Sequence, residues 1–258
     1  MKVVILAGGL GTRISEESHL KPKPMISIGE YPILVHIMRI YASQGFNEFI
    51  VLAGYKQQII KEYFANFDIY TNDVTFDFVN GKRIIHDKPK FDWKVTIVDT
   101  GKNTQTAGRL LRAKKYIGDE PFLLTYGDAV GDIDINSLIE SHKKSNKTAT
   151  ISVYNFGQNK GVVEVEKDGS VSAFREKSDL DGDLINIGYM VVNKDIFDYI
   201  NNDQAVLEKD VLNRLADDGK LHSYTHKGFW QCMDTMSERD YLEKLWQNKD
   251  CPWKVWKK

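Results

Sequence analysis

The sequence has few cysteines and no long apolar segment, and both absences narrow its class. Only two cysteines, Cys232 and Cys251, occur among 258 residues, and they do not form a C-x-x-C pair. This usage indicates neither a disulfide framework nor a zinc site. The apolar run Val3 to Ala7 is shorter than the core of a signal peptide and far short of the roughly 20 residues that cross a bilayer. We therefore expect a cytoplasmic protein with no targeting segment and no membrane partner.

The chain also lacks an excess of charge of either sign. Lys and Arg together number 35 and Asp and Glu 36, which gives a formal net charge of -1. A nucleic-acid-binding surface usually shows as a basic excess, so we expect no nucleic-acid partner. The six histidines show no spacing typical of a metal site or of the base that activates a nucleophile.

What the sequence does contain is a glycine-rich loop directly after an apolar strand. The strand Val3–Ala7 opens into Gly8-Gly9-Leu10-Gly11-Thr12-Arg13. Glycine lets backbone N–H groups approach an anion closely, because no Cβ stands in the way. Arg13, and Lys23 within Lys21-Pro22-Lys23-Pro24, add positive charge beside the loop. The stretch therefore predicts a phosphate site, with a tight turn that binds no ligand as the alternative.

Two other glycine-rich loops can be set aside by spacing. A dinucleotide-binding loop needs G-x-G-x-x-G, but counted from Gly9 the sixth position here is Ile14. A P-loop needs Gly-Lys-Ser/Thr after four intervening residues, and this loop has no such sequence. The loop therefore indicates a nucleotide chemistry of another kind.

The order of the predicted elements indicates one α/β domain, residues 1–258. Repeated strand–helix units favour parallel strands joined by right-handed crossovers, with the ligand beyond the carboxyl ends of the strands. We expect a Rossmann-like open sheet, mixed but mostly parallel and flanked by helices. After 3–7, the predicted strands are 48–53, 94–98, 122–126, 149–154, 162–165, 171–174, 185–192 and 221–225, and the predicted helices are 32–43, 57–64, 105–117, 133–144, 194–200, 207–216 and 237–246.

Two segments depart from this rhythm. Within residues 72–100, a predicted strand 74–79 alternates apolar and polar residues, Asn80-Gly81 is a strong turn signal, and 94–98 is again strand-like, so we predict an inserted β-hairpin there. Such a hairpin would cover the site or meet another subunit. Residues 237–258 form a predicted C-terminal helix and a tryptophan-rich tail, which is typical of a packing or subunit contact.

Two aspartates follow predicted strands and are candidate metal ligands. Asp128 lies just after the apolar strand 122–126. Asp234 follows the aromatic stretch Gly228 to Met233, which could return over the cleft opposite Asp128. Mg²⁺ takes one or two carboxylates and completes its shell with water and substrate phosphates. The alternative for each aspartate is a turn or helix N-cap, a role that also suits Asp134.

A third group of candidates surrounds the last long strand. Glu176 and Lys177 follow the strand that ends near Phe174, and Asn186 lies at the start of the next strand. A lysine aimed into a cleft is a point charge suited to a phosphate. A surface salt bridge is the alternative for Lys177.

These motifs, in this order, resemble the signature of the bacterial sugar 1-phosphate nucleotidyltransferases. LAGGLGTR with the later P-K-P carries the general resemblance. IKEYF, DVTF, VDTG, TAGRL, FLLTYGD, GFWQ and PWKVW, which span the chain from Ile60 to Trp256, are similar to the subgroup that uses CTP and glucose 1-phosphate. The resemblance implies CMP transfer with Mg²⁺ as the cofactor, a homo-oligomer, and a place in nucleotide-sugar supply for surface polysaccharide such as O-antigen.

The resemblance also implies a role for individual residues. Arg13, Lys23 and Asp128 would be catalytic, and Asp128 and Asp234 would bind the metal. The acceptor sugar phosphate would contact Tyr126, Glu176, Lys177 and Asn186. The nucleotide would contact Leu6, Gly8, Gly9, Gly11, Thr12, Arg13, Lys23, Thr106, Gly108 and Arg109.

Three positions depart from the family pattern: Ala129, Ser178 and Ile187, where the family has glycine, proline and glycine. The departures concern the acceptor more than the chemistry, because Ile187 occupies a place where the sugar would pack. Another phosphorylated acceptor, and UTP or dTTP as donor, therefore remain open. A nucleotide-sensing homologue without activity is an alternative of another class, although Arg13, Lys23 and Asp128 are all present.

Overall fold

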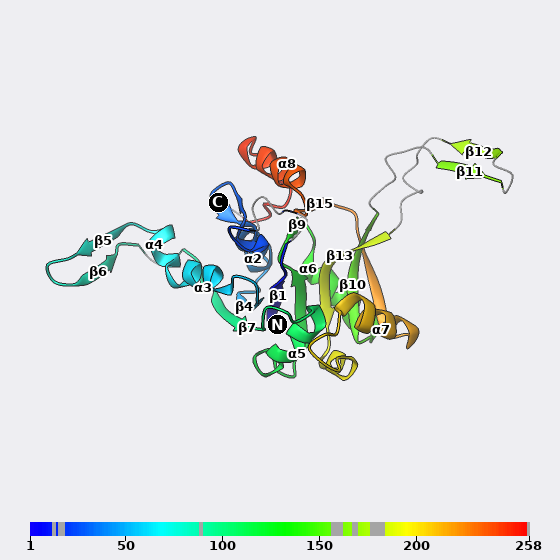
Figure 1. Cartoon of the computed structure of the whole chain (residues 1–258), viewed down its shortest axis with the longest axis horizontal. Coiled ribbons are helices and arrows are strands. Elements are labelled where there is room, and N and C mark those ends of the chain that lie inside the picture. The colour runs from blue at the N-terminus through cyan, green and yellow to red at the C-terminus, as the bar shows by residue number, and fades with distance from the viewer. Residues whose placement is uncertain are drawn as a thin grey trace.

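The computed structural model describes residues 1–11, 14, 19–87, 90–155, 162–166, 170–175 and 184–256. Within these residues a seven-stranded sheet runs in the order β14-β10-β13-β8-β1-β4-β7 (Figure 1). Four of its six pairings are parallel, and β13 is antiparallel to both of its neighbours. The strands are β1 Val3–Ala7, β4 Glu48–Ala53, β7 Lys94–Asp99, β8 Phe122–Tyr126, β10 Ala149–Asn155, β13 Leu184–Val192 and β14 Leu221–His226. The predicted mixed, mostly parallel sheet is confirmed.

Helices cover both faces of this sheet, as the alternation of side chains along β1 requires. Val3 and Ile5 lie in one buried cluster with residues of α2, α6 and α8. Val4 and Leu6 lie in a second cluster with residues of α5 and of the segment from η3 to α7. The helices are α2 Ile33–Ala42, α3 Gln57–Ala65, α4 Phe67–Thr71, α5 Thr106–Ile117, α6 Ile135–Ser145, η3 Lys194–Tyr199, η4 Leu207–Leu212, α7 Asn213–Asp217 and α8 Met236–Gln247.

In the described part of the chain, four two-stranded pairs lie outside the central sheet. The predicted hairpin at 162–174 is observed as β11 paired antiparallel with β12. Two other pairs were not predicted from the sequence, because strands of two or three residues are too short to show a period of two. The strands of these three pairs are β2 Ser27–Ile28, β3 Tyr31–Pro32, β9 Ala129–Gly131, β11 Val162–Val165, β12 Val171–Arg175 and β15 Trp230–Cys232.

The fourth pair, β5 Val74–Asp77 with β6 Lys82–Ile85, forms an arm that extends away from the body (Figure 1). The strand ends earlier than predicted because the Asp77 carboxylate accepts the N–H groups of Val79 and Asn80, each at 3.0 Å, and starts the turn. The predicted insertion 72–100 was too long. Residues 94–99 form β7, an edge strand of the central sheet that pairs parallel with β4.

Two predicted helices have a different internal geometry. Lys194–Tyr199 is a 3₁₀-helix, and the predicted helix 207–216 begins as a π-helical turn, Leu207–Leu212, before continuing as α7. None of the described helices combines the length and apolarity that crossing a membrane requires.

The C-terminal tail packs against α2 and the β2–β3 turn. Trp253 is fully buried, and its indole Nε1 donates to Nδ1 of the buried His36 at 3.4 Å. The His36 ring also lies 4.9 Å from the ring of Trp246, edge to face. The other ring nitrogen, Nε2, lies 2.9 Å from the Ile28 carbonyl oxygen. The predicted packing contact of the tryptophans is therefore made within the chain itself.

Candidate functional site

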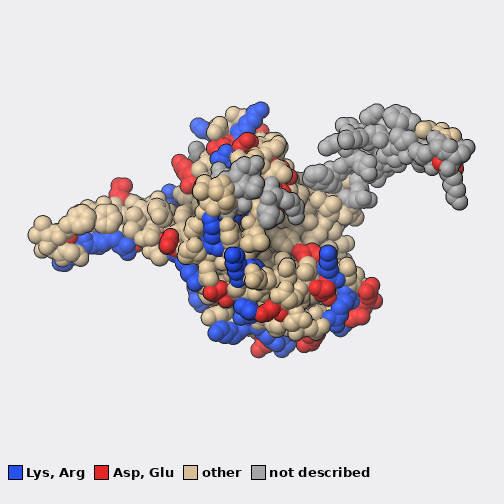
Figure 2. Space-filling model, viewed as in Figure 1, with Lys and Arg blue, Asp and Glu red and all other residues tan. Residues whose placement is uncertain are grey.

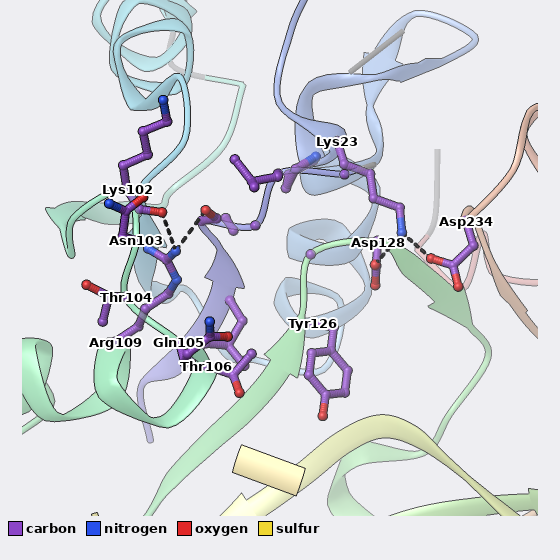
Figure 3. Close-up of a pocket in the computed structure, with 18 residues that line it drawn as sticks. Lys23, Lys102, Asn103, Thr104, Gln105, Thr106, Arg109, Tyr126, Asp128 and Asp234 are labelled. Carbon is purple, nitrogen blue, oxygen red and sulfur yellow. Dashed lines mark hydrogen bonds and ion pairs between the residues drawn. The ribbon is translucent and has the colours of Figure 1, made fainter. Parts of the chain in front are cut away.

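A cleft of about 590 Å³ opens at the carboxyl ends of β1 and β8, where the sheet topology predicts a ligand site. The glycine loop and the loop before α5 line one side, and Lys23 and two aspartates line the other (Figure 3). Tyr126 lies between the two groups (Figure 3). The lining residues are 6–11, Lys23, Pro24, 102–106, Arg109, 126–128 and Asp234.

The three glycines of the loop serve three different purposes. A Cβ on Gly8 would lie 2.2 Å from the guanidinium of Arg109, so this position must be glycine to admit the arginine. A Cβ on Gly9 would meet nothing within 4 Å, which leaves its backbone open toward the cleft. Gly11 has a φ of 66°, a conformation that side chains disfavour. An anion therefore has room to approach the backbone at Gly9, whereas the space beside Gly8 is filled by the Arg109 side chain.

Arg109 of α5 holds the two loops of the cleft together. Its side chain is buried, and Nη2 donates to the Gly8 carbonyl oxygen at 2.9 Å. Nη1 donates at 2.7 Å both to Oγ1 of Thr100 and to the carbonyl oxygen of Gly101. Burial lowers the pKa of the Arg109 guanidinium, and the neighbouring charge of Arg112 lowers that pKa further. Arg109 therefore joins the glycine loop to the segment after β7 and adds a positive charge to the lining of the cleft.

Lys23 lies opposite the glycine loop, on a short 3₁₀ turn, η2 Lys23–Met25. The prolines on either side of it fix the local backbone, and Pro24 is buried. The Lys23 ammonium forms ion pairs with both candidate aspartates, at 2.7 Å from Oδ2 of Asp128 and also with Oδ1 of Asp234 (Figure 3). Side chains separated by more than 200 residues therefore meet at one point of the cleft.

A strand pair brings the two aspartates together. Asp128 precedes β9 and Asp234 follows β15, and these strands pair antiparallel with Cys232 opposite Ala129. The Met233 N–H donates to the Asp128 carbonyl oxygen at 2.9 Å and continues the pairing. The alternative role of Asp234 as a helix cap is not observed, because Thr235 caps α8 in a capping box with Glu238.

The alternative role of Asp134 as a helix cap is observed. The Asp134 carboxylate accepts the Ser137 N–H at 2.9 Å and caps α6. Of the aspartates considered from the sequence, it is therefore the one with a clear structural use.

The two carboxylates form a site that attracts a cation. Burial by itself would lower the pKa of Lys23, but the charges and hydrogen bonds of Asp128 and Asp234 outweigh it and raise that pKa above its ordinary value. The same two carboxylates would suit Mg²⁺, a hard ion that often binds only one or two protein carboxylates. No group of three or more acidic, histidine or cysteine side chains suited to a metal occurs among the described residues. Any remaining ligands would therefore come from substrate and water.

The N-terminus of α5 is docked on the segment before η4. The N–H groups of Ala107 and Gly108 donate to the Ala205 carbonyl oxygen, at 3.0 and 3.2 Å. A Cβ on Gly108 would lie 2.3 Å from the backbone oxygen of Asp203. Gly108 therefore permits this packing and does not line the cleft, whereas Thr106 does.

Of the residues predicted to contact the acceptor, the structure describes Tyr126, which lines the cleft, and Asn186, which is not among the lining residues. Gly188 has a φ of 82°, and a Cβ there would lie 2.3 Å from Cδ2 of Tyr126, so the glycine makes room for the ring. The Asn186 side chain accepts the Gly188 N–H at 2.9 Å. Ile187 is buried in the other cluster, on the opposite face of β13. Ile187 is not among the described residues that line the cleft.

Some candidate residues lie outside the described residues, and some lining residues were not predicted. Thr12, Arg13, Glu176, Lys177 and Ser178 belong to the first group. Eight lining residues were not named from the sequence. Ala7, Leu10, Pro24 and Gly127 lie inside the predicted motifs, and the other four follow the VDTG strand end, where the polar run could have indicated them. These four are Lys102, Asn103, Thr104 and Gln105.

Comparison with known proteins extends this picture to the family. A family profile described as "Nucleotidyl transferase" matches residues 2–247. The chain belongs to the nucleotidyl transferase family. A glucose-1-phosphate cytidylyltransferase of Salmonella typhi is 46% identical over 257 residues, which cover 99% of this chain and 100% of the relative. A probable glucose-1-phosphate cytidylyltransferase of Bacillus subtilis (strain 168) is 44% identical, with the same coverage of both chains.

Solved structures support the fold of this nucleotidyl transferase. The crystal structure of HddC from Yersinia pseudotuberculosis superposes with a TM-score of 0.68 and 24% sequence identity. The match covers 95% of this chain and 99% of that chain. At this identity the likeness concerns the fold, which agrees with the central sheet described above.

Proposed function

We propose that the protein transfers CMP from CTP to α-D-glucose 1-phosphate and releases CDP-glucose and pyrophosphate. The observation that carries the proposal is the cleft in which Lys23, Asp128 and Asp234 face the glycine loop. The choice of CTP and glucose 1-phosphate rests on the names of the relatives that are 46% and 44% identical across the whole chain.

In this reaction an oxygen of the acceptor's phosphate attacks the α-phosphorus of CTP, and the bond to the β-phosphate oxygen breaks. A phosphate is already anionic near pH 7, so the step needs no general base. The chain contributes positioning and charge. The backbone at Gly9 and Gly11 and the positive charges of Arg13 and Lys23 would hold the triphosphate, while Lys177, Glu176 and Asn186 would hold the sugar phosphate.

Asp128 and Asp234 would hold a Mg²⁺ ion at the point where they now share the Lys23 ammonium. When bound, this ion supplies positive charge that stabilises the phosphate oxygens during displacement. Lys23 is then available to the triphosphate, which is the role predicted from the sequence.

A panel of donors and acceptors tests the proposal directly. Pyrophosphate release is measured with CTP, UTP and dTTP, each paired with glucose 1-phosphate and with other sugar 1-phosphates. We expect the pair of CTP and glucose 1-phosphate to give the highest kcat/KM. A higher value for UTP or dTTP would contradict the donor assignment, and no release with any pair would favour a nucleotide-sensing protein without activity.

We also propose that the protein is a homo-oligomer and that the β5–β6 arm makes a subunit contact. The arm carries Phe78 and Val79 at its tip, 92% and 94% exposed, and its surface is mostly uncharged apart from a basic edge (Figure 2). Apolar side chains so exposed usually mark an interface. Light scattering of the double variant Phe78→Ser and Val79→Ser should show a smaller particle than the wild-type protein. An unchanged mass would remove the arm tip from the interface.

The remaining expectations follow from the reaction. A CDP-hexose would supply precursors for surface polysaccharide, and we expect the enzyme to act in the cytoplasm, where its nucleotide substrate is made. Fractionation of the producing cells, followed by an assay for the proposed activity, tests the location.

A further inference from the structure

A carboxylate behind the cleft wall connects the two substrate sides, although it does not line the cleft. Glu208 is the second residue of the π-helical turn η4. It is half-buried, and its Oε1 accepts the hydroxyl proton of Tyr126. Its Oε2 accepts the hydroxyl of Thr106 at 3.3 Å. Both donors line the cleft, so Glu208 contacts the site only through them.

The π-helical turn η4 places the Glu208 carboxylate next to the hydroxyls of Tyr126 and Thr106. Such turns are rare and often occur at functional sites, because the extra residue changes the direction in which side chains project. The Leu207 N–H donates to Oγ1 of Thr106 at 2.7 Å and fixes the turn to the start of α5. The Asp210 carboxylate accepts the Val206 N–H at 2.7 Å and closes the turn on its other side.

The two hydroxyl partners do not depend equally on Glu208. Thr106 is held independently by the Leu207 N–H.

Burial raises the pKa of the Tyr126 hydroxyl, and the charges of Glu208 and Asp128 raise it further, so this hydroxyl keeps its proton. The Tyr126 hydroxyl donates to Glu208, and the ring packs where Gly188 leaves room for it. Loss of the Glu208 carboxylate therefore falls mainly on Tyr126, because Thr106 keeps its bond from Leu207.

We propose that Glu208 is a positioning residue that fixes the Tyr126 ring as the wall between the nucleotide side and the acceptor side of the cleft. This inference rests on the proposed transfer of CMP to a sugar 1-phosphate. A carboxylate suits the position because it only accepts hydrogen bonds and has two oxygens for two hydroxyl donors. A glutamine would offer one accepting oxygen and one donating amide, so it would serve one hydroxyl fully and the other poorly.

The test is a double-mutant cycle on Glu208→Ala and Tyr126→Phe, read as separate KM values for CTP and glucose 1-phosphate. Each single variant should raise the KM for glucose 1-phosphate about 10-fold and change the KM for CTP less than about 2-fold. The double variant should be no worse than either single variant, because both remove the same bond. Glu208→Gln should restore part of the loss.

Asp210→Ala is the matched control, because it weakens the same turn without contacting Tyr126. An equal rise in the acceptor KM in this control would overturn the proposal, as would additive effects in the double variant. If Glu208→Ala does not fold, Tyr126→Phe decides, because it removes the same hydrogen bond from the other side: a KM for glucose 1-phosphate identical to wild type would overturn the inference. An inactive wild-type protein would refute the proposed function itself, whereas an active one with unchanged KM in the variants refutes only the role of Glu208.

Discussion

The buried histidine under the C-terminal tail makes the stability of the protein depend on pH. His36 accepts a hydrogen bond from Trp253 at Nδ1, so its proton must be on Nε2, which donates to the Ile28 carbonyl oxygen. Burial lowers the pKa of His36 to about 4, the bond to Ile28 opposes this shift, and the Arg39 charge adds to it. Protonation in the folded state is therefore unfavourable.

The sign and size of the effect follow from linkage. Because the folded pKa of about 4 lies below the ordinary value of 6.5, the unfolded chain binds the proton more readily between these pH values. The stabilisation is complete above pH 6.5 and is lost as the pH falls toward 4. A shift of this size corresponds to about 3 kcal/mol in total, of which about 2 kcal/mol is lost between pH 7.5 and pH 5.

Urea unfolding at pH 7.5 and pH 5, followed by tryptophan fluorescence, measures this loss. His36→Gln keeps a donor for Ile28 but cannot titrate, so its free energy of unfolding should change about 2 kcal/mol less between the two pH values than that of the wild type. His142→Gln measures separately the contribution of a second buried histidine, whose pKa burial also lowers and which bonds Thr150 and Asn193 away from the tail. The same pH dependence in wild type and His36→Gln would refute the reasoning.

Three further predictions concern the site. Asp128→Asn should lower turnover at least about 100-fold, because the metal loses a carboxylate. As a control, Asp134→Ala removes only a helix cap, so it should keep activity and lower the free energy of unfolding by about 1 kcal/mol. Near-normal pyrophosphate release by Asp128→Asn would contradict the metal assignment. Lys177→Ala should raise the KM for glucose 1-phosphate much more than the KM for CTP, and equal effects would remove Lys177 from the acceptor site. Arg109→Lys should raise the KM for CTP and lower the melting temperature, because one ammonium cannot bond all the oxygens that the guanidinium bonds. Arg112→Lys changes an exposed ion pair, so it should leave both the KM for CTP and the melting temperature unchanged.

The sequence predicted the sheet well because its strands and helices are long enough to show their periods. β4 and β8 have the predicted bounds, and most other elements differ by one or two residues. The pattern failed where a tertiary contact decides the structure. The strand 94–98 was predicted as part of the inserted hairpin, but pairing with β4 makes it an edge strand of the central sheet.

The candidate site was predictable only in part. Lys23, Asp128 and Asp234 stand in motifs, and the structure brings them together. Arg109 was predicted to contact the nucleotide, but the sequence did not show that its guanidinium bonds the Gly8 carbonyl oxygen and requires a glycine there. This contact joins residues 101 positions apart. Glu208 has no local signal, because its partner Tyr126 lies 82 residues earlier. Contacts of this kind depend on the packed fold and cannot be read from spacing.

The tail connects stability to the site. Thr235 begins α8 immediately after Asp234, and Glu243 of this helix accepts the Gly29 N–H at 2.8 Å, close to the β2–β3 turn that follows Lys23. His36 and Trp253 hold the same corner from α2 and the tail. The supports of Lys23 and Asp234 therefore share one buried cluster. Because burial lowers the pKa of His36, its protonation at low pH weakens the packing on which both of these supports rest.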